Sequence, residues 1–339
     1  MRCAVFCVYV LLGAVPGGVA FADWDAGVIA RQRGDFSTAY RAFSAEAEAG
    51  AADAQAVLGE MLIRGQGVPK DEAAGVVWLR RSAENGSVPG MLAFGSAALG
   101  GVGMARDEAL GAQWVARAAN AGSPAAMLVL GDCYERGAGV VRDVVGAHAW
   151  LLKAAQGGDA GGMLLLSDLL LSPAVGDEPA GVAWLTKAAE AGETTAQFRL
   201  AGFLSSGVHG VKRDEAEALR WAQKAAIKDN QAAGLPCTLY SNGIDGQPPD
   251  QAMAVRWCTV AAQSGQVAAM VVLAGLYLNG QGAMRDPGAA LVWASIAAGQ
   301  ATGGVREQAL RLQEAASGVL SEPERTAALA RAAAWRPGQ

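Results

Sequence analysis

The sequence predicts an all-α fold, an α/α solenoid in which antiparallel helix pairs stack into a right-handed superhelix. Two residue types repeat with one period along the 339-residue chain. Tryptophan recurs every 34 to 37 residues, and an aspartate stands seven residues before each of these tryptophans. A fixed period of this length is typical of helical repeat proteins, whose units bury their apolar sides only against neighbouring units. The markers are Trp78, Trp114, Trp150, Trp184, Trp221, Trp257 and Trp293, with Asp71, Asp107, Asp143, Asp177, Asp214, Asp250 and Asp286.

Each period predicts two helices joined by a loop. The second helix contains the tryptophan, then alanines at helical spacing and a closing glycine, as in WLRRSAENG. The first helix of the next unit begins about 12 residues after that tryptophan, with texts such as MLVLGDCYERG. We therefore expect seven units at about residues 51–86, 87–122, 123–158, 159–192, 193–229, 230–265 and 266–301.

The loop within each unit carries a Gly-x-Gly pair and ends in the marker aspartate, as in GQGVPKD. Glycine can end the first helix in the left-handed conformation, and the aspartate can accept hydrogen bonds from free N–H groups of the second. A phosphate-binding loop is disfavoured, because the third glycine and the Gly-Lys-Ser/Thr ending are missing each time. A metal array is disfavoured because equivalent aspartates of neighbouring units lie about 10 Å apart. We expect no metal and no cofactor.

We interpret the tryptophans as packing residues of the second helices, in preference to the lining of a groove for carbohydrate or peptide.

Two units depart from the pattern. The fourth, with LLLSPAVGDEP, lacks the Gly-x-Gly pair and is two residues short, and the sixth places Pro236 early in its first helix. Irregular packing is expected at both.

The order and spacing of these residues resemble the Sel-one-like repeat, a longer relative of the tetratricopeptide repeat, in its exported bacterial form. The resemblance covers residues 51–301 and implies a leading helical hairpin at residues 23–50 and capping helices at residues 302–339. Solenoids need such polar ends. It rests on Leu58-Gly59, Leu130-Gly131, Tyr134, Tyr277, the Gly-x-Gly pairs, the aspartates, the tryptophans and the AA-x-x-G endings.

The first 22 residues are interpreted as a secretory signal peptide. Arg2 provides a positive start, residues 4–15 an apolar run, and Ala20-Phe21-Ala22 a small-x-small cleavage site. The run is too short for a membrane anchor, no later segment is apolar for long enough to span a bilayer, and no lipid-attachment pattern surrounds Cys3 or Cys7. We expect a monomer in the periplasm or outside the cell.

Composition excludes several classes of function. The formal net charge is −5 and no cluster of Lys and Arg is long enough to follow a phosphate backbone, so nucleic acid is not expected as a partner. The chain has only two histidines, His148 on a second helix and His209 in a loop, and none of the common hydrolase motifs. We therefore predict that the protein is not an enzyme.

The resemblance implies that the first helices line the concave face, where a partner would bind. Aligning the units by tryptophan places three acidic residues at one helical position, with arginines four residues later. This band is either a surface for a basic or polar segment of a partner or an ordinary solvated face. Its members are Glu60, Arg64, Asp132, Glu135, Arg136 and Asp168.

Cys237 and Cys258 lie on the two helices of the sixth unit, each about ten residues from the turn, so they could face each other. A disulfide suits an exported protein, and the resemblance implies such bridges in some relatives. Two buried thiols are the alternative, because Cys237 falls in an alignment position that leucine fills elsewhere. Cys133 has no evident partner.

The leading hypothesis is an exported scaffold or adaptor that binds another protein or a peptide segment on the solenoid face. The alternative is a peptidoglycan-binding or glycan-binding protein with weak hydrolase activity, which rests only on analogy with exported relatives. No residues in the sequence supply a nucleophile and a base for it.

Overall fold

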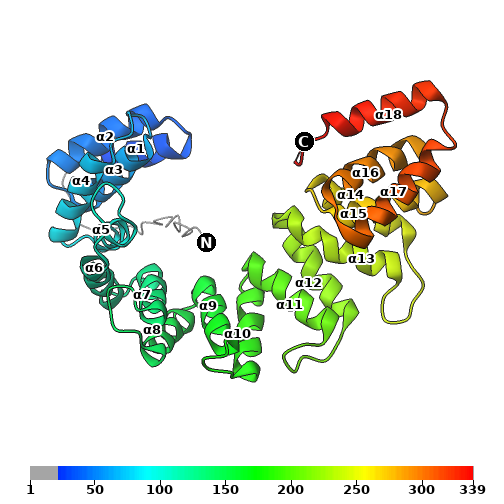
Figure 1. The fold of residues 1–339 in the computed structure, drawn as a ribbon. Coiled ribbons are helices and arrows are strands. Elements are labelled where there is room, and N and C mark those ends of the chain that lie inside the picture. Colours follow the sequence, from blue (N-terminus) through cyan, green and yellow to red (C-terminus); the bar gives the residue numbers. More distant parts are fainter. Residues whose placement is uncertain (1–21, 339) are drawn as a thin grey trace. The chain divides into compact units, whose positions relative to one another are not determined.

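The structure is a computed structural model that describes residues 22–338. These residues form eighteen α-helices and one short 3-10 helix, with no β-strand among them, and consecutive helices pair antiparallel (Figure 1). The predicted all-α solenoid class is confirmed. The predicted signal peptide lies outside the described residues, apart from Ala22, at which the first helix begins. The chain divides into two compact units, the first ending at Leu169 and the second beginning at Leu170.

The first unit begins with a hairpin of two helices, α1 (Ala22–Gln32) and α2 (Phe36–Glu48). Trp24 of α1 packs edge-on against the buried Phe43 of α2, with ring centroids 5.2 Å apart. Three complete repeats and most of α9 follow. Their helices are α3 (Ala52–Arg64), α4 (Glu72–Glu84), α5 (Val88–Gly100), α6 (Glu108–Asn120), α7 (Pro124–Arg136), α8 (Val144–Gln156) and α9 (Ala160–Leu171).

The second unit contains the remaining repeats and two closing helices. Its sixth repeat is irregular: the first helix, α13, has nine residues instead of thirteen and is preceded by the 3-10 helix η1. Pro236 lies in the first turn of α13, where a missing N–H is tolerated. The elements are α10 (Glu178–Glu190), α11 (Thr194–Ser206), α12 (Glu215–Lys228), η1 (Asn230–Ala233), α13 (Gly234–Asn242), α14 (Gln251–Gln263), α15 (Val267–Asn279), α16 (Pro287–Gln300), α17 (Gly303–Ser317) and α18 (Glu322–Ala334).

The seven marker aspartates are the N-cap residues of the second helices. Each carboxylate accepts a hydrogen bond from a backbone N–H two or three residues later, at 2.7–3.1 Å. Six of them also donate their own N–H to a carbonyl near the end of the first helix, as Asp71 does to Leu62 at 2.9 Å. One residue therefore satisfies polar groups at the end of one helix and at the start of the next.

The second glycine of the Gly-x-Gly pair joins neighbouring hairpins. Gly103 has φ +66°, and a Cβ added there would lie 2.1 Å from the carbonyl oxygen of Glu72, the first residue of α4. Gly67, Gly139 and Gly282 make the same close approach to the first residue of α2, α6 and α14. Only glycine fits without displacing the backbone, so each of these loops fixes its repeat against the preceding hairpin.

Candidate functional site

The band predicted on the first helices is present in part. Glu60 lies on α3 with a side chain that is only 16% exposed, and its Oε2 lies 3.5 Å from Arg31 and 4.0 Å from Arg64. Burial raises the pKa of Glu60 above its usual value, although both guanidinium groups act in the opposite direction. The Arg31 partner comes from the leading hairpin, so the residue is tied into the unit and is not a free surface charge.

The other members of the band lie on α7 and α9. Asp132 forms an ion pair with Arg136 one turn later, and the backbone carbonyl of Glu135 accepts a hydrogen bond from Arg142 at 2.9 Å. Asp168 occupies the equivalent position in α9. Acidic residues of the band are thus partly neutralised by arginines of their own helices, which weakens the field that they present to a partner.

The band is restricted to the first unit. Counting back from the glycine that ends each first helix, the second unit has Gly202, Thr238 and Gly275 at the position of Glu60. A Cβ added at Gly202 or Gly275 would have no neighbour within 4 Å, so this position faces open space there. This position is therefore acidic in α3, α7 and α9 of the first unit, with Ser96 in α5, and small and uncharged in α11, α13 and α15 of the second.

The marker tryptophans are less buried than packing residues would be. Trp221 is buried at 9% exposure, and the other six are half-buried. In five repeats the exposed side of the ring is covered by a cation three residues later in the same helix. The distances to the ring centroid are 4.9 Å for Arg81 on Trp78, 4.4 Å for Arg117 on Trp114, 5.0 Å for Lys153 on Trp150, 4.1 Å for Lys187 on Trp184 and 4.1 Å for Lys224 on Trp221.

Sequence analysis missed these cations, although Lys or Arg three residues after five of seven tryptophans is visible in the sequence. All but Lys224 lie in the last turns of their helices, where the negative end of the helix dipole also favours a positive charge. None of the five forms an ion pair with a carboxylate among residues 22–338. They differ in this from Lys70 and Arg106 of the loops, which pair with Glu72 and Glu108.

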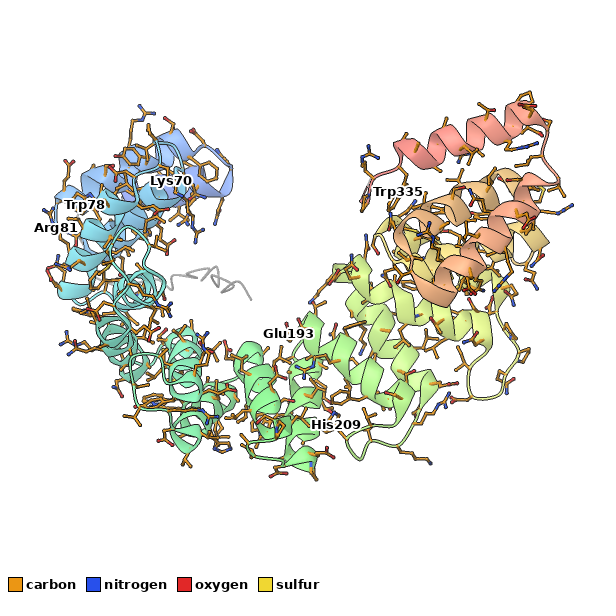
Figure 2. The ribbon with its side chains drawn as sticks, viewed as in Figure 1. Lys70, Trp78, Arg81, Glu193, His209 and Trp335 are labelled. Carbon is orange, nitrogen blue, oxygen red and sulfur yellow. A yellow bond between two sulfur atoms is a disulfide. The ribbon has the colours of Figure 1, made fainter. Side chains whose placement is uncertain are left out.

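The last two tryptophans have no cation. Val260 and Ile296 stand at the corresponding positions, and the end of the chain packs on this face. Trp335 lies edge-on to Trp293 with ring centroids 6.2 Å apart, and the N–H of Gly338 donates to the carbonyl of Gln263 at 2.9 Å. Trp335 is labelled in Figure 2. A segment of the protein's own chain therefore covers the tryptophan face of the sixth and seventh repeats.

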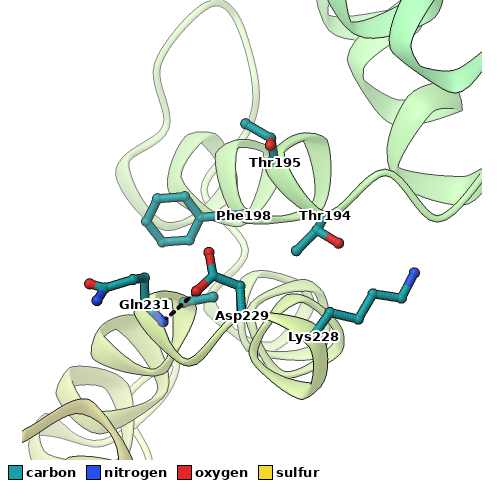
Figure 3. Close-up of a pocket in the computed structure, with 7 residues that line it drawn as sticks. Thr194, Thr195, Phe198, Lys228, Asp229 and Gln231 are labelled. Carbon is teal, nitrogen blue, oxygen red and sulfur yellow. Dashed lines mark hydrogen bonds between the residues drawn. The ribbon is translucent and has the colours of Figure 1, made fainter. Parts of the chain in front are cut away.

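A shallow hollow of about 350 Å³ lies in the second unit between α11, the end of α12 and η1 (Figure 3). Phe198 is 45% exposed beside it, and Lys228 and Asp229 lie at its edge. Lys228 donates to the carbonyl of Gly192 at 3.0 Å, and Asp229 accepts from the N–H of Gln231 at 2.9 Å. The charged groups are therefore occupied by the backbone, and the hollow brings together no nucleophile and base.

The two histidines lie in different units and play no common role. His148 is half-buried on α8. His209 has φ +52° and stands in the loop of the fifth repeat at the place of the second glycine, with Nδ1 3.0 Å from the Glu178 carboxylate and its ring beside Phe203. Within residues 22–338 no group of three or more His, Cys, Asp or Glu could hold a metal ion, and no helix is long and apolar enough to cross a membrane.

Cys237 and Cys258 form a disulfide, with Cα atoms 4.6 Å apart. The prediction that Cys237 takes a leucine position is wrong. The sixth loop is one residue longer than the regular loop, and counting from the helix end puts Cys237 at the position of Gly59 and Gly131.

Cys133 is free and buried, and burial raises the pKa of its thiol to about 11.

These features define a repeat scaffold: paired helices, capped and clamped at their loops, with differently charged helical faces. The chain belongs to the Sel1 repeat family, the Sel-one-like repeat expected above. The family model matches residues 52–87, 91–123, 124–159, 163–193, 194–230, 233–266 and 267–301, which is more than half of the chain. Proteins built from this repeat generally mediate protein–protein interaction and are generally non-catalytic scaffolds.

Solved structures of other repeat proteins are similar to this chain. A Sel1 repeat protein from Oxalobacter formigenes is 25% identical with a TM-score of 0.61, and the match covers 70% of this chain and 98% of that one. A protective antigen of uropathogenic Escherichia coli with this fold is 25% identical over 92% of this chain and 82% of its own, with a TM-score of 0.42. No curated protein sequence matches the chain.

Proposed function

We propose that this protein is an exported adaptor that binds a partner protein through the solvent-facing side of its first helices. The observation that carries the proposal is the run of seven Sel1 repeats, because a repeat solenoid offers a long surface and no catalytic centre. The contact residues on this face are those of the first-unit band, with Asp132 and Asp168 as acidic anchors for a basic or polar segment. The protein acts as a monomer.

Export to the periplasm or the extracellular space is part of this proposal. It is supported by the signal-like residues 1–22 and by the Cys237–Cys258 disulfide, since disulfides persist in oxidising compartments. Fractionation followed by N-terminal sequencing tests it. We expect a chain that starts at Asp23 outside the cytoplasm, and an intact N-terminus in the cytoplasmic fraction would refute export.

Capture of a partner from the exported fraction tests the binding surface. Charge reversal at Asp132 and Asp168, which are half-buried on α7 and α9, should weaken capture at least tenfold with little change in the melting temperature. Reversal of Asp25 and Glu48, which are exposed on the leading hairpin, is the matched control and should have no effect. Unchanged capture by the Asp132 and Asp168 variant would remove this face, and binding only to purified peptidoglycan would replace the proposal with the glycan-binding alternative.

A further inference from the structure

The second helices carry a different surface, and its cations form no ion pair with a carboxylate within residues 22–338. In the first unit Arg81, Arg117 and Lys153 occupy the same position in α4, α6 and α8, each above the indole ring of its own helix. The ring holds the side chain in place, so binding a ligand orders little that is not already ordered. Trp78 and Arg81 are labelled in Figure 2.

The lack of carboxylates over these rings contrasts with the rest of the unit. The cations of the loops and first helices are paired: Lys70 with Glu72, Arg106 with Glu108, and Arg136 with Asp132. Arg142, which has no acidic residue two positions later, donates instead to the carbonyl of Glu135. Only Glu84 of the acidic residues in α4, α6 and α8 lies near the exposed ends of these helices, one turn beyond Arg81. The row therefore keeps its positive charge.

The second unit shows what can occupy this face. Where Val260 and Ile296 replace the cation, the residues that follow α18 lie there, with Trp335 on Trp293 and Pro337 beside Gly265. The face is apolar in those repeats, and so are the side chains that contact it, Trp335 and Pro337, whereas Arg336 between them donates to carbonyls of its own segment. In the first unit the equivalent face has the same half-buried tryptophans with a cation above each, which favours a chain of the opposite charge.

We propose that the row of Arg81, Arg117 and Lys153 is a docking surface for an extended acidic segment of a partner protein. The segment's carboxylates pair with the three cations, while its backbone and methylene groups lie along the indole edges. Helices in direct contact lie about 10 Å apart, and a first helix packs between successive second helices, so equivalent residues of the second helices lie at least that far apart. An extended chain advances about 3.3 Å per residue, so carboxylates at every third position recur about every 10 Å and one of them falls near each cation. This surface is independent of the first-helix band.

The test uses a fluorescent peptide of about twelve residues with Glu at every third position and Gly and Ser between. Fluorescence anisotropy should show saturable binding to the full chain that weakens as salt is raised, because both partners are solvent-exposed. The same peptide with Gln in place of Glu should not bind. A wild-type chain that shows no preference for the Glu peptide would overturn the proposal.

Two triple variants locate the binding. Arg81→Gln, Arg117→Gln and Lys153→Gln together should reduce affinity at least tenfold. The control is Lys70→Gln, Arg106→Gln and Arg142→Gln, which removes the same number and kinds of charge from the same three repeats and should change affinity less than twofold. Equal losses in both triples would reduce the effect to net charge and refute a docking row.

A third triple guards against misfolding. Arg81→Lys, Arg117→Lys and Lys153→Arg keep a cation over each ring and should retain binding within about threefold. If the Gln triple also lost its helical circular dichroism signal, the single variants Arg81→Gln, Arg117→Gln and Lys153→Gln would be compared with Lys70→Gln, Arg106→Gln and Arg142→Gln, and only the first set should weaken binding. Tighter binding to vesicles with anionic headgroups than to the Glu peptide would contradict a protein segment as the occupant.

Discussion

The two units are built from the same repeat, but they differ where backbone segments come closest together. In the three complete repeats of the first unit, the second loop glycine lies against the first residue of the second helix in the preceding hairpin. Within the described part of the second unit, Gly282 alone does so. His209 and Asp245, both with positive φ, stand at this place in the fifth and sixth repeats.

His209 and Asp245 hold the neighbouring hairpins together with their side chains, where glycine does so by close packing of the backbone. His209 contacts the carboxylate of Glu178, the first residue of α10, in place of a backbone-to-backbone approach. Asp245 accepts hydrogen bonds from the N–H groups of Glu215 and Ala216 at 3.4 and 3.2 Å, at the start of α12. Side-chain bonds therefore fix neighbouring hairpins in these repeats, whereas close packing of glycine fixes them in the first unit.

The two units also differ in the residue at which the two helices of a repeat come closest to each other. Gly59 and Gly95 let α3 and α5 approach α4 and α6 so closely that an added Cβ would lie 2.8 Å from a leucine or valine side-chain carbon of the partner helix. The second unit has Ala201 and Ala274 at this position, and Cys237 in the sixth repeat, where the disulfide joins the two helices. In the fifth to seventh repeats the helix-crossing position thus takes a side chain where Ala222, Cys258 and Ala294 stand in place of the larger Leu79 and Val115.

The largest expected effect comes from breaking the loop contact of the first unit. Gly103→Ala forces an L residue into the left-handed region and places its Cβ against the Glu72 carbonyl. The free energy of unfolding should fall by about 3 kcal/mol, the sum of backbone strain and overpacking. Urea denaturation followed by circular dichroism measures it.

Gly122→Ala is the matched control for this change. Gly122 has φ +95° in the same repeat, but nothing lies within 4 Å of an added Cβ. It should lose only the strain of the left-handed conformation, about 1–2 kcal/mol. Equal losses at the two glycines would show that the approach to Glu72 contributes nothing.

The fold shared by the two units could be predicted from the sequence, because the regular spacing of tryptophan and aspartate is typical of a helical repeat protein. Two residue types in one register predict the helix pairs, and Asp71 and its equivalents indicate where each second helix begins. The position of Cys237 was assigned wrongly because counting from tryptophan ignores the longer sixth loop. Helix ends, not the tryptophans, set the register of a first helix.

The candidate sites were harder to predict, because they depend on contacts between segments distant in sequence. Nothing near Glu60 indicates that Arg31 of the leading hairpin reaches it. The cover of Trp293 by Trp335, 42 positions later, is equally invisible in a repeat alignment, since the closing helices have no counterpart in other units. The cations over the tryptophans were predictable and were overlooked.

A change of similar expected size tests the comparison at the helix crossing. Replacing both Cys237 and Cys258 by alanine gives the sixth repeat the residues that the fifth and seventh repeats already have, Ala201 with Ala222 and Ala274 with Ala294. The packing is therefore native to the repeat, and the loss isolates the bond. For a separation of 21 residues we expect a decrease of about 3 kcal/mol in the free energy of unfolding.

Reductant and thiol counting complete this test. In dithiothreitol the variant and the wild type should unfold within about 1 kcal/mol of each other, the usual effect of a tolerated core substitution. A wild-type chain that starts at Asp23, unfolded without reductant, should expose one reactive thiol, that of Cys133. Three reactive thiols would contradict the disulfide.

The smallest effect concerns the first-helix position of Glu60, which is acidic in α3, α7 and α9 and uncharged in the second unit. Because burial raises the pKa of Glu60, the folded state binds a proton more tightly than the unfolded state there. The Glu60 contribution to stability is then fully present below the pKa of an unfolded glutamate, about 4.3, and is lost as pH rises through the higher folded value. Glu60→Gln cannot ionise, so its stability relative to wild type should increase as pH rises through this window.

Glu324 provides a control of opposite sign. Hydrogen bonds from the hydroxyl and N–H of Ser321 hold the pKa of the Glu324 carboxyl below its usual value. Its contribution is present above the pKa of an unfolded glutamate and is lost as pH falls through the lower folded value, so Glu324→Gln should lose stability relative to wild type as pH rises. Urea denaturation of the three proteins between about pH 3 and pH 7 measures both slopes. If the Glu60→Gln slope had the sign of the Glu324→Gln slope, the ion pairs with Arg31 and Arg64 would outweigh the burial of Glu60, and the first-helix position would be stabilised by its charge.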